Sequence, residues 1–286
     1  MKIRDILAQR TPSLSFEVFP PKVQENYDNV EKAAFEIAKL NPSFMSVTYG
    51  AGGGTSRYTV GIASDLQKKC GVNVLAHLTC VSSTREEVKA ALQQYKEHGI
   101  ENVLALRGDI PAGGRVAEDY HYASELIYDI KQFDPDICIG AACYPEGHVE
   151  SVNKTVDIEH LKEKVEAGCE FVTTQMFFDN NILYNYLYRI REKGITVPVV
   201  AGIMPVTNVK QIERSCKMSG TYLPSRFKAI VDRFGDNPEA MKQAGIAYAT
   251  EQIIDLLANH VNGIHVYSMN KPEVAAKIQE NLKGII

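Results

Sequence analysis

The chain has 286 residues, of which 45% are hydrophobic and 23% are charged, and its formal net charge at pH 7 is −4. These values are ordinary for a soluble globular protein and exclude disordered, fibrous and low-complexity classes. The small net charge and the lack of a lysine- or arginine-rich block argue against nucleic acid and against an anionic membrane as partners. A small-molecule partner is therefore the default expectation.

The N-terminal segment, MKIRDILAQRTPS, carries charges where a signal peptide needs its apolar segment, and no run of about 18 apolar residues follows it. We therefore expect a cytoplasmic protein. The six cysteines are scattered singly, without a C-x-x-C pair, so we expect reduced packing residues and no metal site.

Short runs of apolar and β-branched residues recur along the chain and predict eight strands. They cover residues 14–19, 44–49, 74–80, 102–108, 137–144, 171–178, 197–203 and 263–269. Between them, apolar residues at spacings of three and four predict helices, for example over 30–40, 86–99 and 161–168. The segment SSTREEV offers a capping box that pairs Ser83 with Glu86 or Thr84 with Glu87.

The alternation of strands and helices predicts parallel βαβ units, and the nearly continuous apolar strands favour a sheet that is covered on both sides. A (β/α)8 TIM barrel satisfies both conditions. An open doubly wound sheet would need a glycine-rich turn after the first strand to hold a dinucleotide, whereas this chain has FPPK there. The stretch between the seventh and eighth strands can supply three extra helices. No Pro/Ser/Gly-rich linker marks a boundary, so we predict one domain over residues 1–286.

Active sites of such barrels lie at the C-terminal ends of the strands. Polar residues gather at these predicted ends: Glu17, Thr48, Tyr49, His77, Thr79, Arg107, Asp109, Tyr144, Glu146, His148, Gln175, His265 and Tyr267. Polar side chains buried without partners would cost several kcal/mol each, at roughly 2–7 kcal/mol per group, so they indicate a large polar ligand or an internal hydrogen-bond network.

Structural alternatives exist for several of these residues. Arg107 and Asp109 could form an ion pair, and His77 could be a core histidine with satisfied hydrogen bonds. Gln175 and Tyr267 could bond to the backbone. The glycines of YGAGGGTS, residues 49–56, match a phosphate-binding loop only weakly, and a turn that needs positive φ explains them as well.

The motifs SFEVFPPK, VTYGAGGGTSRYT, HLTC, LALRGD, CYPEGH, TTQMFFD, AGIMP and HVYSMN follow one another between residues 15 and 270. In this order and spacing the chain resembles methylenetetrahydrofolate reductases of the bacterial type. The resemblance implies a barrel that binds FAD at its C-terminal face. NADH, NADPH or another electron source would reduce the flavin, which would then pass hydride to 5,10-methylenetetrahydrofolate in a ping-pong reaction and form 5-methyltetrahydrofolate.

The resemblance makes Glu17 the general acid. Opening the five-membered ring of the substrate requires a proton on the departing nitrogen, and a partly desolvated carboxyl group holds its proton to higher pH. Because Glu17 stands between Phe16 and Val18, followed by Phe19, we expect its pKa to be raised toward neutrality.

The resemblance also assigns binding residues. Asp109 would lie near the flavin ring and the pterin and would help to set the flavin potential. The positions that match FAD contacts are Thr48, His77, Arg107, Gly108, Asp109, Tyr120, Tyr144, His148, Asp157 and Lys164. Gln175 would bind the pterin, and Tyr267 would lie near the glutamate tail of the folate. Lys271 replaces a family arginine at that tail.

Val209 stands where better-known members carry an aromatic residue that stacks on nicotinamide or folate. The loss of stacking leaves the electron donor open between a nicotinamide and a partner electron-transfer subunit. Two other functions stay open: a flavin barrel that oxidises an amine, as in proline dehydrogenases, and a flavin-carrying electron-transfer subunit of a larger complex. We also expect a homo-oligomer.

Overall fold

The computed structural model describes residues 1–9, 11–21, 23–49, 56–110 and 116–286. Eight parallel strands pair in chain order, and β8 pairs with β1 to close a barrel. The strands are β1 (Ser13–Val18), β2 (Phe44–Val47), β3 (Val74–Thr79), β4 (Asn102–Leu106), β5 (Cys138–Cys143), β6 (Phe171–Thr174), β7 (Val199–Ile203) and β8 (Gly263–Tyr267). All eight predicted strands are confirmed. Closure of the sheet confirms the TIM barrel and excludes the open doubly wound alternative.

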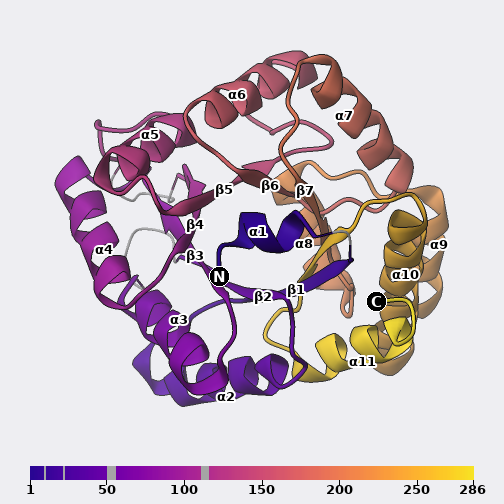
Figure 1. Ribbon diagram of the computed structural model, residues 1–286. Coiled ribbons are helices and arrows are strands. Elements are labelled where there is room, and N and C mark those ends of the chain that lie inside the picture. The colour runs from indigo at the N-terminus through magenta and orange to yellow at the C-terminus, as the bar shows by residue number, and fades with distance from the viewer. Residues whose placement is uncertain (10, 22, 50–55, 111–115) are drawn as a thin grey trace.

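Helices surround the barrel in a ring (Figure 1). After the short 3-10 helix η1 (Gln24–Asn26), they are α2 (Tyr27–Ala38), α3 (Ser56–Cys70), α4 (Arg85–Glu97), α5 (Ala123–Phe133), α6 (Lys154–Glu166), α7 (Asn180–Glu192) and α11 (Pro272–Leu282). The capping box at the start of α4 is formed by Thr84 and Glu87, which decides between the two predicted pairs.

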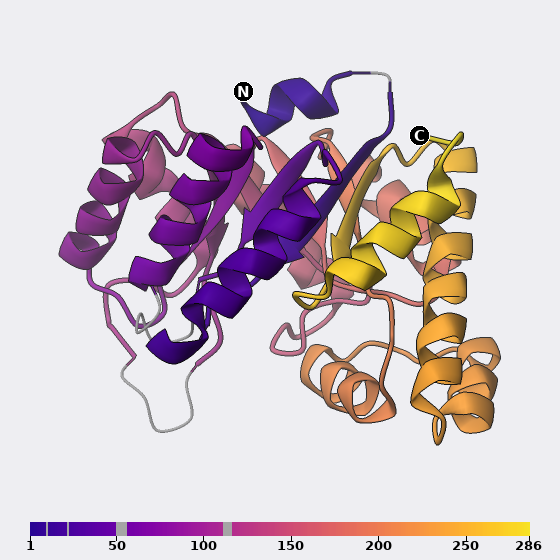
Figure 2. The same ribbon diagram turned by 90° about the horizontal axis from the view of Figure 1, so that it is seen from below.

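The three extra helices between β7 and β8 are confirmed as α8 (Val209–Ser219), α9 (Ser225–Phe234) and α10 (Pro238–Ala258). Figure 2 shows α8 and α9 at one end of the barrel and the N-terminal helix at the other. A separate apolar cluster holds these helices against the segments that follow β6 and β7. It comprises Met176, Phe178, Val206, Ile212, Phe227, Val231 and Met241.

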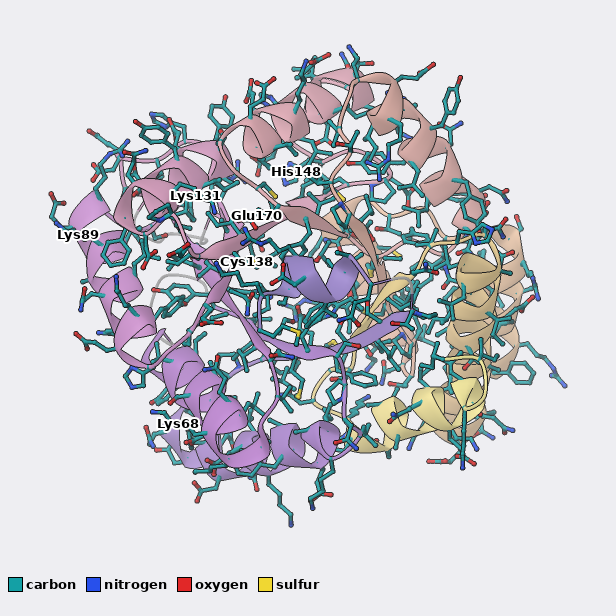
Figure 3. The ribbon with its side chains drawn as sticks, viewed as in Figure 1. Lys68, Lys89, Lys131, Cys138, His148 and Glu170 are labelled. Carbon is teal, nitrogen blue, oxygen red and sulfur yellow. The ribbon has the colours of Figure 1, made fainter. Side chains whose placement is uncertain are left out.

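A short helix that the sequence did not predict, α1 (Ile3–Leu7), lies across the N-terminal end of the barrel (Figures 1 and 2). Ile3 and Ile6 pack on an inner apolar layer made by Phe44, Leu75, Leu104, Cys138, Phe171 and Val200. The backbone N–H of Ile3 donates to Asn102 Oδ1 at 2.8 Å. At the same end, Lys131 and Glu170 approach one another near Cys138 (Figure 3), with 2.6 Å between Nζ and Oε1. This end of the barrel is therefore closed by apolar packing.

Alternate residues of each strand face opposite sides of the barrel wall. On β1, Leu14, Phe16 and Val18 belong to the core between the strands and the helices, while Ser15 and Glu17 point into the barrel. The apolar residues that flank Glu17 in the sequence thus lie on the opposite side of the wall from its carboxylate.

None of the helices in the described ranges is both long and apolar enough to cross a membrane. All six cysteines are free thiols, and four of them are buried, in agreement with packing residues. In the same described ranges no group of three or more His, Cys, Asp or Glu side chains could hold a metal ion.

Candidate active site

A cavity of about 1070 Å³ opens at the C-terminal ends of the strands. It exceeds the roughly 300–1,000 Å³ that is usual for a pocket holding one drug-sized ligand. The predicted site residues that line it are Glu17, Thr48, His77, Arg107, Gly108, Asp109, Tyr120, Tyr144, His148, Asp157, Lys164, Gln175 and Tyr267. Residues from all parts of the chain are therefore brought to one cavity, as the barrel rule predicts.

The Glu17 carboxylate meets three polar side chains inside the barrel. Its Oε2 atom lies 3.5 Å from Ser46 Oγ, 3.7 Å from His77 Nε2 and 3.9 Å from His265 Nε2. These partners come from β2, β3 and β8, so they are close only because the sheet closes on itself.

The expectation of a raised pKa for Glu17 is wrong. Burial raises the pKa of this carboxyl group, but the neighbouring side chains of His265, His77 and Ser46 favour its charged form and outweigh burial. The net pKa is lowered below its usual value. The sequence argument failed because it took Phe16 and Val18 as the surroundings of the carboxylate.

The turn between β8 and α11 fixes the backbone around Glu17. Ser268 Oγ donates to the Glu17 carbonyl at 2.6 Å. The amide of Asn270 bonds both backbone groups of Phe19, at 3.0 Å to N and 2.9 Å to O. Met269 and Asn270 have φ values of 55° and 53°, a left-handed conformation that costs on the order of 1–3 kcal/mol per residue. These side-chain hydrogen bonds help to hold the strained turn. They thereby fix the position of the Glu17 backbone along the barrel axis.

His77 is not a core histidine with satisfied hydrogen bonds. Its side chain is buried, with 6% of the residue exposed, yet within the described part of the chain its Nε2 atom has no hydrogen-bond partner. Burial lowers the pKa of His77 to about 4, although the charge of Glu17 opposes this. The ring is therefore neutral near pH 7, and it presents an open hydrogen-bonding atom at the cavity floor.

Two cationic side chains stand on the wall of the cavity. Arg107 forms a two-pronged ion pair with Glu150, at 2.6 and 2.9 Å, so its ion-pair partner is Glu150 and not the Asp109 that the sequence suggested. Lys164 Nζ donates to the Ala142 carbonyl at 2.9 Å, and burial lowers its pKa. Between them they offer positive charge to an anionic ligand.

Gly108 follows Arg107 with a φ of +88°, and a Cβ there would lie 3.0 Å from the Cβ of Thr79. A larger residue would be strained both by conformation and by contact, because side chains rarely adopt this region. The glycine lets the chain turn closely past β3 and carry Asp109 to the cavity rim.

The loop between β5 and α6 carries another group of predicted residues. The ring of His148, labelled in Figure 3, meets the ring of Tyr144 edge-on at 4.7 Å. Asp157 Oδ1 accepts from the backbone N–H of His148 at 3.3 Å and from Ser151 Oγ at 3.2 Å. These bonds hold the loop across the cavity wall.

Two other residues predicted to contact FAD, Thr48 and Tyr120, make hydrogen bonds within the protein. Thr48 uses both backbone groups, donating to Val18 O and accepting from Thr59 Oγ1. Tyr120 is buried, and its hydroxyl donates to Asp129 on α5 at 2.8 Å.

The residues assigned to the folate divide into two groups. Gln175 and Tyr267 line the cavity, and both also bond to the backbone, as the structural alternative proposed. Gln175 Oε1 accepts from Met176 N at 2.9 Å, and the Tyr267 hydroxyl donates to Thr174 O at 2.6 Å. Gly202 leaves room for this tyrosine, because a Cβ there would lie 2.5 Å from its hydroxyl.

Lys271 and Val209 are not among the described residues that line the cavity. Lys271 Nζ donates to Thr207 Oγ1 at 2.6 Å and so ties the β8–α11 turn to the segment after β7. Val209 packs with the apolar cluster of the extra helices, close to Gly235. The glycines of YGAGGGTS at positions 50–55 lie outside the described residues.

Sequence reasoning missed the polar residues beneath Glu17. Ser15 and Ser46 are fully buried, and His265 was noted only as a polar residue of the eighth strand. The available signal was the period of two, since Ser15 and Glu17 share a face of β1. Glu150 was missed as well, because its pairing with Arg107 joins two loops.

Among solved structures, the chain is similar to an uncharacterised protein from Clostridium thermocellum whose title says that it binds two copies of 5-methyl-5,6,7,8-tetrahydrofolic acid. The TM-score is 0.69 at 15% identity, and the match covers 100% of both chains. It is also similar to tryptophan synthase from M. tuberculosis, with a TM-score of 0.59 at 11% identity over 98% of this chain and 96% of that one. At these identities the likeness shows the fold alone.

Sequence relatives are closer. The probable methylenetetrahydrofolate reductase (NADH) of Oryza sativa subsp. japonica is 36% identical over 100% of this chain and 50% of its own length, so the chain spans about half of that relative. The 5,10-methylenetetrahydrofolate reductase of Escherichia coli (strain K12) is 33% identical over 94% of this chain and 90% of its own length. The profile of the family described as methylenetetrahydrofolate reductase matches residues 2–283. The chain therefore belongs to the methylenetetrahydrofolate reductase family.

Proposed function

We propose that this protein reduces 5,10-methylenetetrahydrofolate to 5-methyltetrahydrofolate with FAD as its flavin. The observation that carries the proposal is the Glu17 carboxylate at the floor of a large cavity with a polar wall. Family membership supports the same reaction. No observation favours the amine-oxidising or electron-transfer alternatives.

The polar side chains of the cavity wall suit the chemical groups of a flavin dinucleotide. Arg107 supplies a planar fork for a pyrophosphate, and Lys164 supplies a second cation. The open Nε2 atom of buried His77 is a hydrogen-bonding group that a ligand would satisfy. Asp157 can accept from a ribose or adenine. When bound, FAD supplies the hydride.

The chain itself supplies positioning and a proton. Converting a methylene bridge into a methyl group consumes one hydride at carbon and one proton at the nitrogen that leaves it. Glu17 would donate that proton as the general acid, a role worth about 10²- to 10⁴-fold in rate. Gln175, with a donor and an acceptor on one amide, would orient the pterin. Tyr267 and Lys271 would lie toward the folate tail. Lys271 would act there by anchoring the turn between β8 and α11.

Asp109 would act on the flavin through its charge. A carboxylate at the cavity rim disfavours an anionic reduced flavin and so favours giving the hydride away. For the electron donor, the plant relative named with NADH supports a nicotinamide, NADH or NADPH. A partner subunit is the competing source. A cytoplasmic homo-oligomer of one domain stays a prediction.

An anaerobic absorbance experiment tests the function. The flavin band of the purified protein is recorded, and NADH and 5-methyltetrahydrofolate are then added in separate cuvettes. We expect both to bleach the band. Bleaching by the folate alone would move the electron donor to a partner subunit, and a band that neither compound bleaches would refute the proposal.

The Glu17→Gln variant tests the role of the general acid. Folate reduction should fall by about 10²- to 10⁴-fold, whereas flavin reduction by NADH, which needs no proton from this group, should persist. Full folate reduction by the variant would contradict the assignment.

A further inference from the structure

A continuous chain of hydrogen-bonding side chains runs beneath Glu17 inside the barrel. Ser46 Oγ lies 3.5 Å from Glu17 Oε2 and 3.1 Å from His265 Nε2. On the other side of the ring, His265 Nδ1 lies 2.8 Å from Ser15 Oγ, which donates to the Ile264 carbonyl at 2.9 Å. Ser15, Ser46 and His265 are at most 2% exposed, so bulk water does not interrupt the chain.

The carbonyl at the end of the chain assigns the hydrogens. A carbonyl oxygen can only accept, so we assign the single hydroxyl hydrogen of Ser15 to the Ile264 carbonyl. With that assignment Ser15 Oγ accepts from His265, and Nδ1 of the ring carries the proton. Nε2 is left as the atom whose protonation can change. It faces Ser46, and through Ser46 it faces Glu17.

Two proton arrangements satisfy these bonds. In one, His265 is doubly protonated, Nε2–H donates to Ser46, and the Ser46 hydroxyl donates to a Glu17 carboxylate. In the other, protonated Glu17 donates to Ser46, and the Ser46 hydroxyl donates to a bare Nε2. Passing between them breaks the Nε2–H bond and the original Ser46 O–H bond. It forms a new Ser46 O–H bond and a Glu17 O–H bond, so one net proton moves from the ring to the carboxylate.

We propose that His265 stores the proton that Glu17 delivers to the folate, with Ser46 as the relay and Ser15 as the residue that fixes the ring. The proposal rests on the proposed function, because that reaction consumes one proton in each turnover. Ser46, His265 and Ser15 act through Glu17, so they are positioning residues.

Neighbouring groups are consistent with this role. The titratable side chains that face His265 within the described ranges are Glu17, His77 and Tyr267. His77 has a pKa of about 4 and so has no proton to give near neutral pH, and the Tyr267 hydroxyl is committed to Thr174. Phe44 stacks on His265, with 5.9 Å between ring centres and an angle of 8°, and holds the ring in plane.

The relay also resolves the lowered pKa of Glu17. The neighbours of Glu17 favour its charged form, yet a general acid must be protonated at the moment of reaction. The 3.5 Å contact is longer than the roughly 2.7–2.8 Å of a typical O–H···O bond, so transfer requires Glu17 to move toward Ser46 by about 0.7 Å. Rotation of the glutamate side chain can supply that movement.

A kinetic experiment on the flavin-loaded enzyme tests the relay. Ser46→Ala removes the bridging hydroxyl, and Ser13→Ala is the matched control, since Ser13 is a buried serine two residues before Ser15 on the same strand. Stopped-flow absorbance follows flavin reduction by NADH and flavin reoxidation by 5,10-methylenetetrahydrofolate, the latter in mixtures of H2O and D2O.

We expect Ser46→Ala to slow reoxidation by about 10²-fold and to leave flavin reduction unchanged. In the wild type, the plot of reoxidation rate against the D2O fraction should be curved, because two protons move in one step. In Ser46→Ala the plot should be linear. Ser13→Ala should match the wild type. Unchanged reoxidation in Ser46→Ala would overturn the relay, and so would equal slowing of both half-reactions, which indicates a structural defect.

A second measurement needs neither flavin nor folate. Histidine-labelled ¹⁵N NMR of the whole chain reports which ring nitrogens carry protons, and His265→Gln assigns the signal. We expect Nδ1 to be protonated and Nε2 to lose its proton in Glu17→Gln, since the carboxylate partner is gone. A bare Nδ1, or an Nε2 signal that Glu17→Gln leaves in place, would overturn the proposal. If the wild type ignores folates, the proposed function fails, while this measurement still decides whether the proton is shared.

Discussion

The buried His77 should make the protein sensitive to acid. The pKa of this histidine is lowered from 6.5 to about 4 by burial. Between these pH values His77 binds a proton in the unfolded chain but not in the folded protein. The contribution of His77 to the free energy of unfolding is therefore fully present above pH 6.5 and is lost as the pH falls toward 4. The whole shift corresponds to about 3 kcal/mol, and the part between pH 7 and pH 5 is about 2 kcal/mol.

Urea unfolding of the flavin-free protein at pH 7 and pH 5 measures this contribution, with His77→Gln as the variant. The wild type should lose about 2 kcal/mol more than the variant between the two pH values. His260→Asn is the control, since His260 is exposed and its φ of 63° suits asparagine. Between pH 7 and pH 5, His260→Asn should lose as much free energy of unfolding as the wild type.

Equal losses of stability in wild type and His77→Gln would refute the reasoning. They would mean that the folded protein protonates His77 as readily as the unfolded chain does. The open Nε2 atom would then not be held neutral at the cavity floor.

Three further changes test the site. Asp109→Asn should raise the flavin midpoint potential, measured by equilibration with a reference dye, because it would remove a negative charge from the proposed flavin site; a potential that stays the same or falls would contradict the assignment. Glu150→Gln should tighten FAD binding in a fluorescence titration by up to about fivefold, since the variant no longer competes with a pyrophosphate for Arg107 and an exposed ion pair is worth up to ~1 kcal/mol; weaker binding would show that Glu150 helps the cofactor. Asn270→Ala should lower the free energy of unfolding by about 2 kcal/mol, because two hydrogen bonds to Phe19 are lost; an unchanged urea midpoint would show that the turn holds without them.

Local sequence patterns were enough for the fold and for the polar residues at the ends of the strands. Strand and helix periods identified the eight strands and the three helices between β7 and β8, because those periods arise from the backbone geometry of each segment. The barrel rule then placed polar strand ends such as Glu17 and Gln175 at one cavity, since parallel strands end on the same side.

The environment of each side chain was decided only by closure of the sheet. The carboxylate of Glu17 faces Ser46 and His265, from strands that are distant in the sequence, and these contacts lower a pKa that its sequence neighbours suggested would rise. Helix α1 was missed because five residues are too few for a periodic signal, and its place depends on the apolar end of the barrel that it covers. Sequence therefore determined the strands and the polar residues at their ends, whereas charge state, hydrogen-bond partners and the proposed proton relay depend on contacts across the barrel, which exist only in three dimensions.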